Sequence, residues 1–327
     1  MTKIGELKEK GYFIDVDWIR ILGRALPSLV FIALRYPRLI KNANRACPDG
    51  PQNLKPEKLP YKIPKYKDGM KFCRSKKRYL RQTHLCNPLD KEIIALGNSL
   101  GAFQKSDWEY GETIFKFVNE SIRVDFSPIK SALKTLYAGH GTCVDKMSLF
   151  IALCRMGGIP ARYKLYSPEI VEEGYNLYMA ADPLIKKWYD ALGFFVIHGS
   201  AEVKIKGEWV VCDVSGDPYH FPALNLPFMR FGEDPSDKYL RAAEGTGVIR
   251  PEGLPFGIKF IAGLPFKFFG GTGRAINSSV KANYEKGKKI FEKISIDEYD
   301  RNIRKTYKPK WASSGKRASK VLAELDD

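Results

Sequence analysis

The sequence lacks several features that mark secreted and membrane-spanning proteins. It has six cysteines in 327 residues, too few for a disulfide framework. Its longest uncharged run within the first apolar segment, Ala25 to Leu34, is far shorter than the ~20 apolar residues that a spanning helix needs. Residues 1–10 are charged and contain no apolar run, so no secretory signal is visible. We therefore expect a cytoplasmic protein, in a compartment that keeps a thiol reduced.

Motifs of nucleotide-binding and zinc-binding proteins are also missing. We find no internal repeat, phosphate-binding loop or dinucleotide fingerprint. No Cys-x-x-Cys pair occurs, and a zinc site built from Cys47, Cys73, His84 and Cys86 would need ligands from three separate places. The sequence therefore predicts no metal site and no cofactor.

What the sequence does have is positive charge, with a net value of +17 that is concentrated at the two ends. Residues 1–90 hold 20 basic and 8 acidic side chains, residues 91–230 hold 15 and 16, and residues 231–327 hold 19 and 13. This distribution predicts a near-neutral core between two basic extensions. An excess of this size favours an anionic partner, which could be a membrane surface, a nucleic acid or an acidic polymer.

The N-terminal extension contains two distinct segments. Apolar and arginine residues alternate over Asp17 to Asn42, which predicts a basic amphipathic helix bent at Pro27. Such a helix packs on its own protein or lies on an anionic bilayer, and the sequence leaves both alternatives open. From Cys47 to Lys67 the chain is rich in proline and lysine, which predicts an extended arm.

The most informative stretch runs from Gly141 to Tyr163. Apolar side chains at three-and-four spacing predict a helix with one buried face: Met147, Phe150, Ile151, Leu153 and Cys154. Thr142 followed by Asp145 predicts a capping box that puts Cys143 in the first turn, and Gly157-Gly158 predicts the end. Unpaired N–H groups at a helix start favour an anion, so a thiolate nucleophile fits this position. A lone cysteine is more often structural, so the hypothesis needs a base.

A second stretch, Phe194 to Ser215, supplies that base. Its alternation predicts a β-hairpin that turns at Lys206-Gly207, with His198 and Asp213 on the face opposite the core. In this register Asp213 lies opposite Ser200 and within diagonal reach of His198. A carboxylate there would fix the imidazole tautomer and stabilise the imidazolium. The spacing therefore predicts that these side chains and Cys143 form a catalytic triad.

With these motifs, the region from Ile114 to Ser215 resembles the transglutaminase-like superfamily, which includes peptide N-glycanases and is related to papain. The matching pieces are Gly141-Thr-Cys143, the segment Gly157 to Tyr163, His198 with Glu202, and Trp209 with Asp213. The resemblance implies an α+β fold in which a helix-borne cysteine packs on an antiparallel sheet. It also implies that Cys143 is the nucleophile, His198 the general base and acid, and Asp213 the orienting carboxylate. Ser200 stands where the family commonly has an aromatic residue, and Val214 where it often has proline.

Between the two stretches, Ser167 to Gly193 is longer than a connection needs and is rich in aromatic residues. We expect a lid or wall of the substrate site that replaces the aromatic residue missing at Ser200; an extra packed helix is the alternative. The candidate substrate-binding residues are Tyr175, Tyr178, Trp188 and Ser200. Elsewhere we expect helices at Leu89–Gly101, Asp107–Ile122, Pro128–Tyr137 and Val280–Lys305, a mobile tail from Lys308, and a purely structural loop at Asp217 and His220.

The predicted function is that of an amide hydrolase or acyltransferase that forms an acyl-enzyme on Cys143 with a protein or peptide substrate. Hydrolysis is favoured because no calcium-binding loop is visible, and a protein-crosslinking transglutaminase is the alternative. A non-catalytic scaffold that binds an anionic surface through its basic extensions, peripherally at a membrane for example, is a third possibility. Peptide N-glycan hydrolysis is a weaker one, because the Cys-x-x-Cys metal site of some such enzymes is absent.

Overall fold

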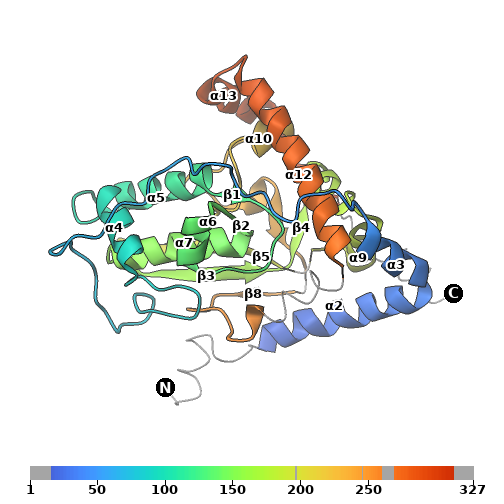
Figure 1. Ribbon diagram of the computed structural model, residues 1–327, viewed down its shortest axis with the longest axis horizontal. Helices are drawn as coiled ribbons and strands as arrows, with labels where there is room; N and C mark the ends of the chain where they lie inside the picture. Colours follow the sequence, from blue (N-terminus) through green and yellow to red (C-terminus); the bar gives the residue numbers. More distant parts are fainter. Residues whose placement is uncertain (1–15, 196, 245, 260–268, 313–327) are drawn as a thin grey trace.

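The buried centre of the protein is helix α7, Cys143–Met156, which lies against a four-stranded antiparallel sheet (Figure 1). The computed structural model describes residues 16–195, 197–244, 246–259 and 269–312. From Val144 to Met156 every residue of α7 is buried, toward the surrounding helices as well as toward the sheet. The predicted α+β core is confirmed, whereas the prediction that α7 buries only one face is wrong.

Local sequence determines both ends of α7. The Thr142 hydroxyl accepts the Asp145 backbone N–H at 3.3 Å, and Asp145 Oδ2 accepts the Thr142 N–H at 2.9 Å. Gly157 follows the last turn, and Gly158 takes a φ of +89°, in the region where glycine is favoured. The predicted capping box and glycine stop are confirmed, so Cys143 is the first residue of the helix.

The sheet has the strand order β6-β5-β3-β8. Its strands are β3 Ala161–Tyr166, β5 His198–Ile205, β6 Glu208–Cys212 and β8 Val248–Ile249. Lys206 and Gly207 form the turn between β5 and β6 with φ values of +51° and +91°, and Ala201 pairs with Cys212. This register is the predicted one, and it continues to bring Asp213 opposite Ser200.

The helical side of the core precedes α7 in the chain. Its elements are α4 Lys91–Ser99, α5 Asp107–Ser121, β1 Arg123–Val124, α6 Ala132–Ala138 and β2 His140–Gly141. Helices α4, α5 and α6 all contact α7 (Figure 1). The three helices predicted here are confirmed, with ends that differ from the predicted ones by up to four residues. Strands β1 and β2 pair in parallel and hold the chain just before Cys143.

The segment between β3 and β5 is a packed layer of short elements. It comprises β4 Pro168–Ile170, α8 Glu172–Gly174, the π-helical η1 Tyr175–Met179 and α9 Pro183–Leu192. After the hairpin come α10 His220–Ala223, the 3₁₀ helix η2 Pro235–Asp237 and β7 Leu240–Ala242, and β7 pairs with β4. The alternative of extra packed helices therefore describes this segment.

Both basic extensions pack on the core. The elements are α2 Val16–Arg35 and α3 Pro37–Arg45 at one end, and α12 Gly270–Phe291 and α13 Ile296–Thr306 at the other. Helix α12 contacts α3, α10 and η1, and α2 contacts α9 (Figure 1). The proline-rich arm crosses the core, where the Tyr61 hydroxyl donates to the Leu136 carbonyl at 2.5 Å.

Two predicted helices are wrong because each is divided in two. The N-terminal one is interrupted at Tyr36, just before Pro37, rather than bent at Pro27, which lies inside α2. The C-terminal one is interrupted between Phe291 and Ile296, where the Ser295 hydroxyl caps α13. Within the described ranges, no helix combines the length and apolarity needed to cross a membrane. Residues 1–15 and most of the predicted tail, 313–327, lie outside the described residues.

Candidate active site

Cys143 is placed by the cap that begins α7. Its thiol is free and half-buried, and it occupies the first helical position after Thr142. The N–H groups of a first helical turn lack partners inside the helix, and they point toward any anion at this end. The position therefore suits both a thiolate and the oxyanion that forms when a thiolate attacks a carbonyl.

His198 and Asp213 meet where the hairpin strands leave the sheet. His198 is the first residue of β5, and Asp213 directly follows β6. The His198 Nε2 and Asp213 Oδ2 atoms are 3.0 Å apart, and Asp213 Oδ1 accepts the Ser215 backbone N–H at 2.9 Å. With Nε2 turned to the carboxylate, Nδ1 is the ring nitrogen left for the thiol.

The charges at this site favour an imidazolium. Burial lowers the pKa of His198, but the negative charge and hydrogen bond of Asp213 and the neighbouring Cys143 side chain outweigh it and raise the pKa to about 10. Burial raises the pKa of Asp213, yet attraction to His198 holds that pKa below its usual range. The structure thus brings the three predicted triad side chains together, with His198 between the thiol and the carboxylate.

Of the three predicted aromatic substrate-binding residues, Tyr178 has triad side chains among its electrostatic neighbours. Burial raises its pKa, and the charges of Asp217, Cys143 and Asp213 add to the rise. Its ring lies 5.8 Å from the ring of Phe126, centroid to centroid. Tyr178 belongs to η1, whose wider turn is frequent at functional sites. Tyr178 is therefore the aromatic residue of this segment that remains a candidate for the predicted wall beside the thiol.

The other three residues have different surroundings. Ser200 is fully buried within β5, so contact between its hydroxyl and a substrate stays a prediction. The Tyr175 hydroxyl donates to Asp190 at 2.7 Å, and Trp188 Nε1 donates to the Ser28 hydroxyl at 2.9 Å. These are packing contacts, and the substrate-binding role of Tyr175 and Trp188 stays a prediction.

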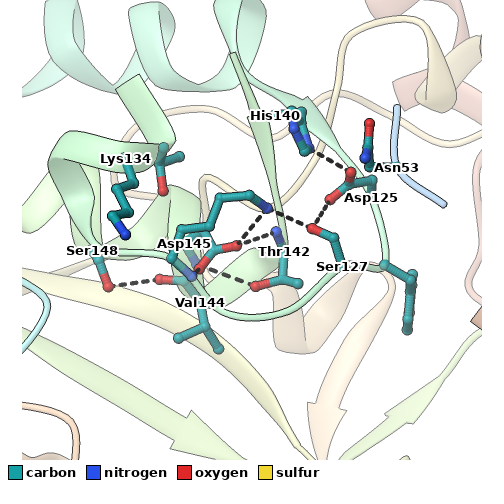
Figure 2. Close-up of polar contacts among 12 residues, drawn as sticks. Asn53, Asp125, Ser127, Lys134, His140, Thr142, Val144, Asp145 and Ser148 are labelled. Atoms are coloured by element: carbon teal, nitrogen blue, oxygen red, sulfur yellow. Dashed lines mark hydrogen bonds and ion pairs between the residues drawn. The ribbon is translucent and has the colours of Figure 1, made fainter. Parts of the chain in front are cut away.

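A second histidine–carboxylate pair, which the sequence analysis missed, lies beside the start of α7 (Figure 2). His140 Nδ1 and Asp125 Oδ2 are 2.6 Å apart, and the Ser127 hydroxyl donates to Asp125 Oδ1 at 2.8 Å. Lys130 joins the pair to the α7 cap, because its Nζ donates to Ser127 Oγ at 2.6 Å and its backbone N–H to Asp145 Oδ1 at 2.7 Å. We name these residues, with Asp145, the cap network; it fixes the loop that presents Cys143.

A buried cation was missed as well. Lys146 lies one turn after Cys143 on α7 and is fully buried, although the sequence pattern gave no reason to separate it from a solvated lysine. Its Nζ donates to the carbonyls of Gly216 at 2.5 Å and Asn119 at 3.3 Å. Asp217, predicted as structural, accepts the Tyr219 backbone N–H, and His220 Nδ1 bonds to Asn283 at 2.8 Å.

No group of three or more His, Cys, Asp or Glu side chains in the described ranges is arranged to hold a metal ion. The residues considered for zinc have other neighbours. The His84 ring packs on Phe256 with 5.2 Å between centroids, and Cys86 is buried beside Arg155.

Comparison with known proteins finds a family similarity over the core. The transglutaminase-like superfamily matches residues 94–214, which include Cys143, His198 and Asp213. A solved structure, a candidate cysteine protease from Cytophaga hutchinsonii, is similar with a TM-score of 0.31 and 21% identity over 42% of this chain. The similarity covers 40% of that protein, which is less than half of its length, and it is too distant to extend to activity. No protein of curated function matches the sequence.

Proposed function

Starting from a transglutaminase-like core at residues 94–214, we propose that this protein is a thiol enzyme that opens amide bonds in protein or peptide substrates. The observation that carries the proposal is the position of His198, hydrogen-bonded to Asp213 and adjacent to the Cys143 thiol. Because the pKa of His198 is raised to about 10, its imidazolium form persists at neutral pH, and an imidazolium beside a cysteine favours nucleophilic attack by the sulfur. Cys143, His198 and Asp213 are the proposed catalytic residues.

The proposed reaction has two halves. The Cys143 thiolate attacks the amide carbonyl carbon, and the first-turn N–H groups of α7 stabilise the oxyanion. The C–N bond then breaks, the His198 Nδ1 proton goes to the leaving amine, and a thioester remains on Cys143. In the second half His198 takes a proton from water, the hydroxide oxygen replaces sulfur at the acyl carbon, and an acid is released. Asp213 stays ionised and holds the ring orientation throughout.

Water and amines compete for the thioester, so the same residues also support acyl transfer. We favour hydrolysis; in the transglutaminase alternative a substrate amine replaces water. The two outcomes differ in product: hydrolysis gives a free carboxylate, and transfer gives a new amide. Supplying a dansylated primary amine together with peptide amides measures both products in one reaction.

The test of the enzyme proposal is the capture of an acyl group on the nucleophile. The full chain is incubated with a cell extract, quenched in acid and digested, and the peptide that contains Cys143 is analysed by mass spectrometry for added acyl mass. We expect adducts on wild type and none on Cys143→Ala, with Cys73→Ala, a half-buried cysteine outside the triad, behaving as wild type. Extract profiles and amide cleavage that are identical for wild type and Cys143→Ala would refute the proposal.

A second candidate function, attachment to an anionic bilayer surface, is favoured by α2. Val30, Phe31 and Leu34 are 56%, 40% and 78% exposed and lie on one side of the helix, and Arg35 and Arg38 beside them are also exposed. An apolar stripe flanked by arginines matches the acyl boundary and headgroups of an anionic membrane. This role is compatible with catalysis, and it would give the basic N-terminal extension a binding function.

Vesicle sedimentation tests the attachment. We expect the full chain to sediment with phosphatidylcholine–phosphatidylserine vesicles and to stay in solution with pure phosphatidylcholine vesicles. Leu34→Asp should reduce binding strongly, whereas Ile296→Asp, an equally drastic change at an exposed apolar site on α13, should leave it unchanged. Equal loss in both variants, or binding that does not depend on the anionic lipid, would argue against α2 as the attachment site.

A further inference from the structure

Lys146 is a buried cation in an unusual setting. It follows Cys143 by three residues on α7, which places both residues on the same side of the helix, and its buried ammonium donates to the backbone carbonyls of Gly216 and Asn119. Among the described residues it forms no direct ion pair with a carboxylate. A charge taken out of water costs several kcal/mol unless it is compensated, and methionine of similar length could fill the same space. Packing alone therefore gives no reason for a lysine here.

The groups that face the ammonium come from three elements. Cys143 lies on the same helix, Asp213 and Asp217 lie in the segment after β6, and His220 begins α10. Burial lowers the pKa of Lys146 to about 8, and attraction to Asp217, Asp213 and Cys143 opposes that fall. Burial raises the pKa of Asp217 to about 6, opposed by Lys146, and it lowers that of His220 to about 3. At neutral pH the ammonium is therefore charged and His220 is neutral.

The sum of charges around the thiol shows what the ammonium does. The His198 imidazolium and the Asp213 carboxylate are bonded to each other, so together they bring little net charge to the site. A thiolate beside them adds one negative charge in a largely buried place. The ammonium of Lys146 is a second cation that interacts with Cys143, and it is not hydrogen-bonded to Asp213. It also ties the residues after Asp213 to α7 through the Gly216 carbonyl.

We propose that Lys146 is a positioning residue of the nucleophile, whose buried ammonium favours the Cys143 thiolate and fixes the Asp213–Asp217 segment against α7. The inference rests on the proposed function, in which Cys143 attacks as a thiolate. Lys146 itself touches no reacting atom. Its role is to set the pH range over which the sulfur is anionic and the distance at which the carboxylate acts.

The test measures the alkylation rate of Cys143 by iodoacetamide between pH 4 and 9, with peptide mapping to separate it from the other cysteines. Lys146→Met should alkylate at least about tenfold more slowly near pH 6, with its inflection moved to higher pH, because a nearby opposite charge shifts a titration by roughly one to three units. Lys146→Arg should recover part of the rate. Lys134→Met, which removes an exposed charge on α6, should match wild type.

Thermal unfolding separates this role from a structural one. We expect Lys146→Met to melt at or above the wild-type temperature while its sulfur is less reactive, because it removes a buried charge. A folded Lys146→Met with wild-type alkylation rate and pH profile overturns the inference. If Lys146→Met does not fold, Lys146→Gln decides: it keeps an N–H donor for the Gly216 carbonyl but has no charge, so its inflection should also move to higher pH. An unchanged inflection, or one moved to lower pH, overturns the inference.

The two proposals fail in different ways. If the triad proposal is wrong, wild-type Cys143 alkylates no faster near neutral pH than the half-buried Cys47 and Cys73. If only the role of Lys146 is wrong, wild-type Cys143 is fast and the lysine variants are equally fast. The readout is the reactivity of the sulfur and does not require a known substrate.

Discussion

Two histidine–carboxylate pairs flank the start of α7, and they differ in what surrounds them. In the cap network Asp125 receives His140, the Ser127 hydroxyl and the Leu54 backbone N–H, so its acceptor sites bond to structural groups. At the triad Asp213 receives His198 and one backbone N–H, and the imidazole has the Cys143 thiol as its other neighbour. The same two residue types therefore fix a loop in one place and, in the function that we propose, transfer a proton in the other.

The two pairs also differ in the length of the hydrogen bond between histidine and carboxylate. The His140–Asp125 contact is 2.6 Å and the His198–Asp213 contact is 3.0 Å, so the shorter pair is the structural one. Asp125 accepts hydrogen bonds from β2, from its own loop and from the proline-rich arm. Burial raises the pKa of Asp125, but His140 and Lys130 outweigh burial and hold that pKa below its usual range. The catalytic role that we propose for His198 rests on the adjacent Cys143 thiol and not on the length of its hydrogen bond to Asp213.

The largest expected effect is on the triad carboxylate. Asp213→Asn keeps the shape of the side chain, but the asparagine amide group can hydrogen-bond to the wrong tautomer of His198. We expect amide cleavage to fall by about 10²–10⁴-fold, with little change in the far-ultraviolet circular dichroism. Kinetics on the peptide amides measure this. If Asp213→Asn cleaved amides at nearly the wild-type rate, the His198–Asp213 pair would be structural, like the His140–Asp125 pair.

The corresponding change in the cap network should affect stability more than chemistry. Asp125→Asn weakens the bonds to His140, Ser127 and Leu54, and leaving a buried donor unsatisfied costs about 1–3 kcal/mol. Urea unfolding should show this loss, while Cys143 alkylation in the folded protein stays within about threefold of wild type. A loss of reactivity as large as that of Asp213→Asn would make the cap network part of the chemical site.

The pH dependence of stability should separate the pairs further. Because the pKa of His198 is raised to about 10, its contribution to stability is fully present below its unfolded pKa of about 6.5 and is lost as pH rises through about 10. The lowered pKa of Asp213 adds stability above about pH 3.9, which is lost as pH falls through the lowered value. We therefore expect the melting temperatures of wild type and His198→Gln to differ most near pH 5–6 and to converge above about pH 10. Curves that stay parallel up to that pH would contradict the raised pKa.

We expect the smallest effect on stability at the Thr142–Asp145 cap of α7, which lies between the cap network and the triad. Thr142→Ala removes the hydroxyl that accepts the Asp145 N–H, and loss of such a cap costs about 1 kcal/mol. Thr142→Ser keeps the hydroxyl and serves as the matched control in the same denaturation experiment. If the Thr142→Ala and Thr142→Ser variants are equally stable, the hydrogen bond that the backbone N–H of residue 142 donates to Asp145 is sufficient to hold the helix start.

Short-range features could be predicted because neighbouring residues determine them. Thr142 and Asp145 cap α7, and Lys206-Gly207 turns the hairpin in the register that places Asp213 beside His198. The breaks at Tyr36 and Ser295 were missed because an uninterrupted amphipathic pattern outweighed local signals, namely Pro37 and a capping serine. Ser200 was assigned to the substrate site by analogy with the family's aromatic residue, but β5 buries it.

The sequence by itself determined where α7 starts and how the hairpin pairs, because these depend on contacts between near neighbours, and it singled out the side chains of the proposed triad by residue type. Tertiary structure decided which histidine faces the sulfur. His140 lies three residues before Cys143 yet bonds to Asp125, and His198 arrives from a strand far along the chain. Packing on both sides of α7 also decided that Lys146 is buried and charged. Burial depends on every element that covers a residue, and no local pattern contains that information.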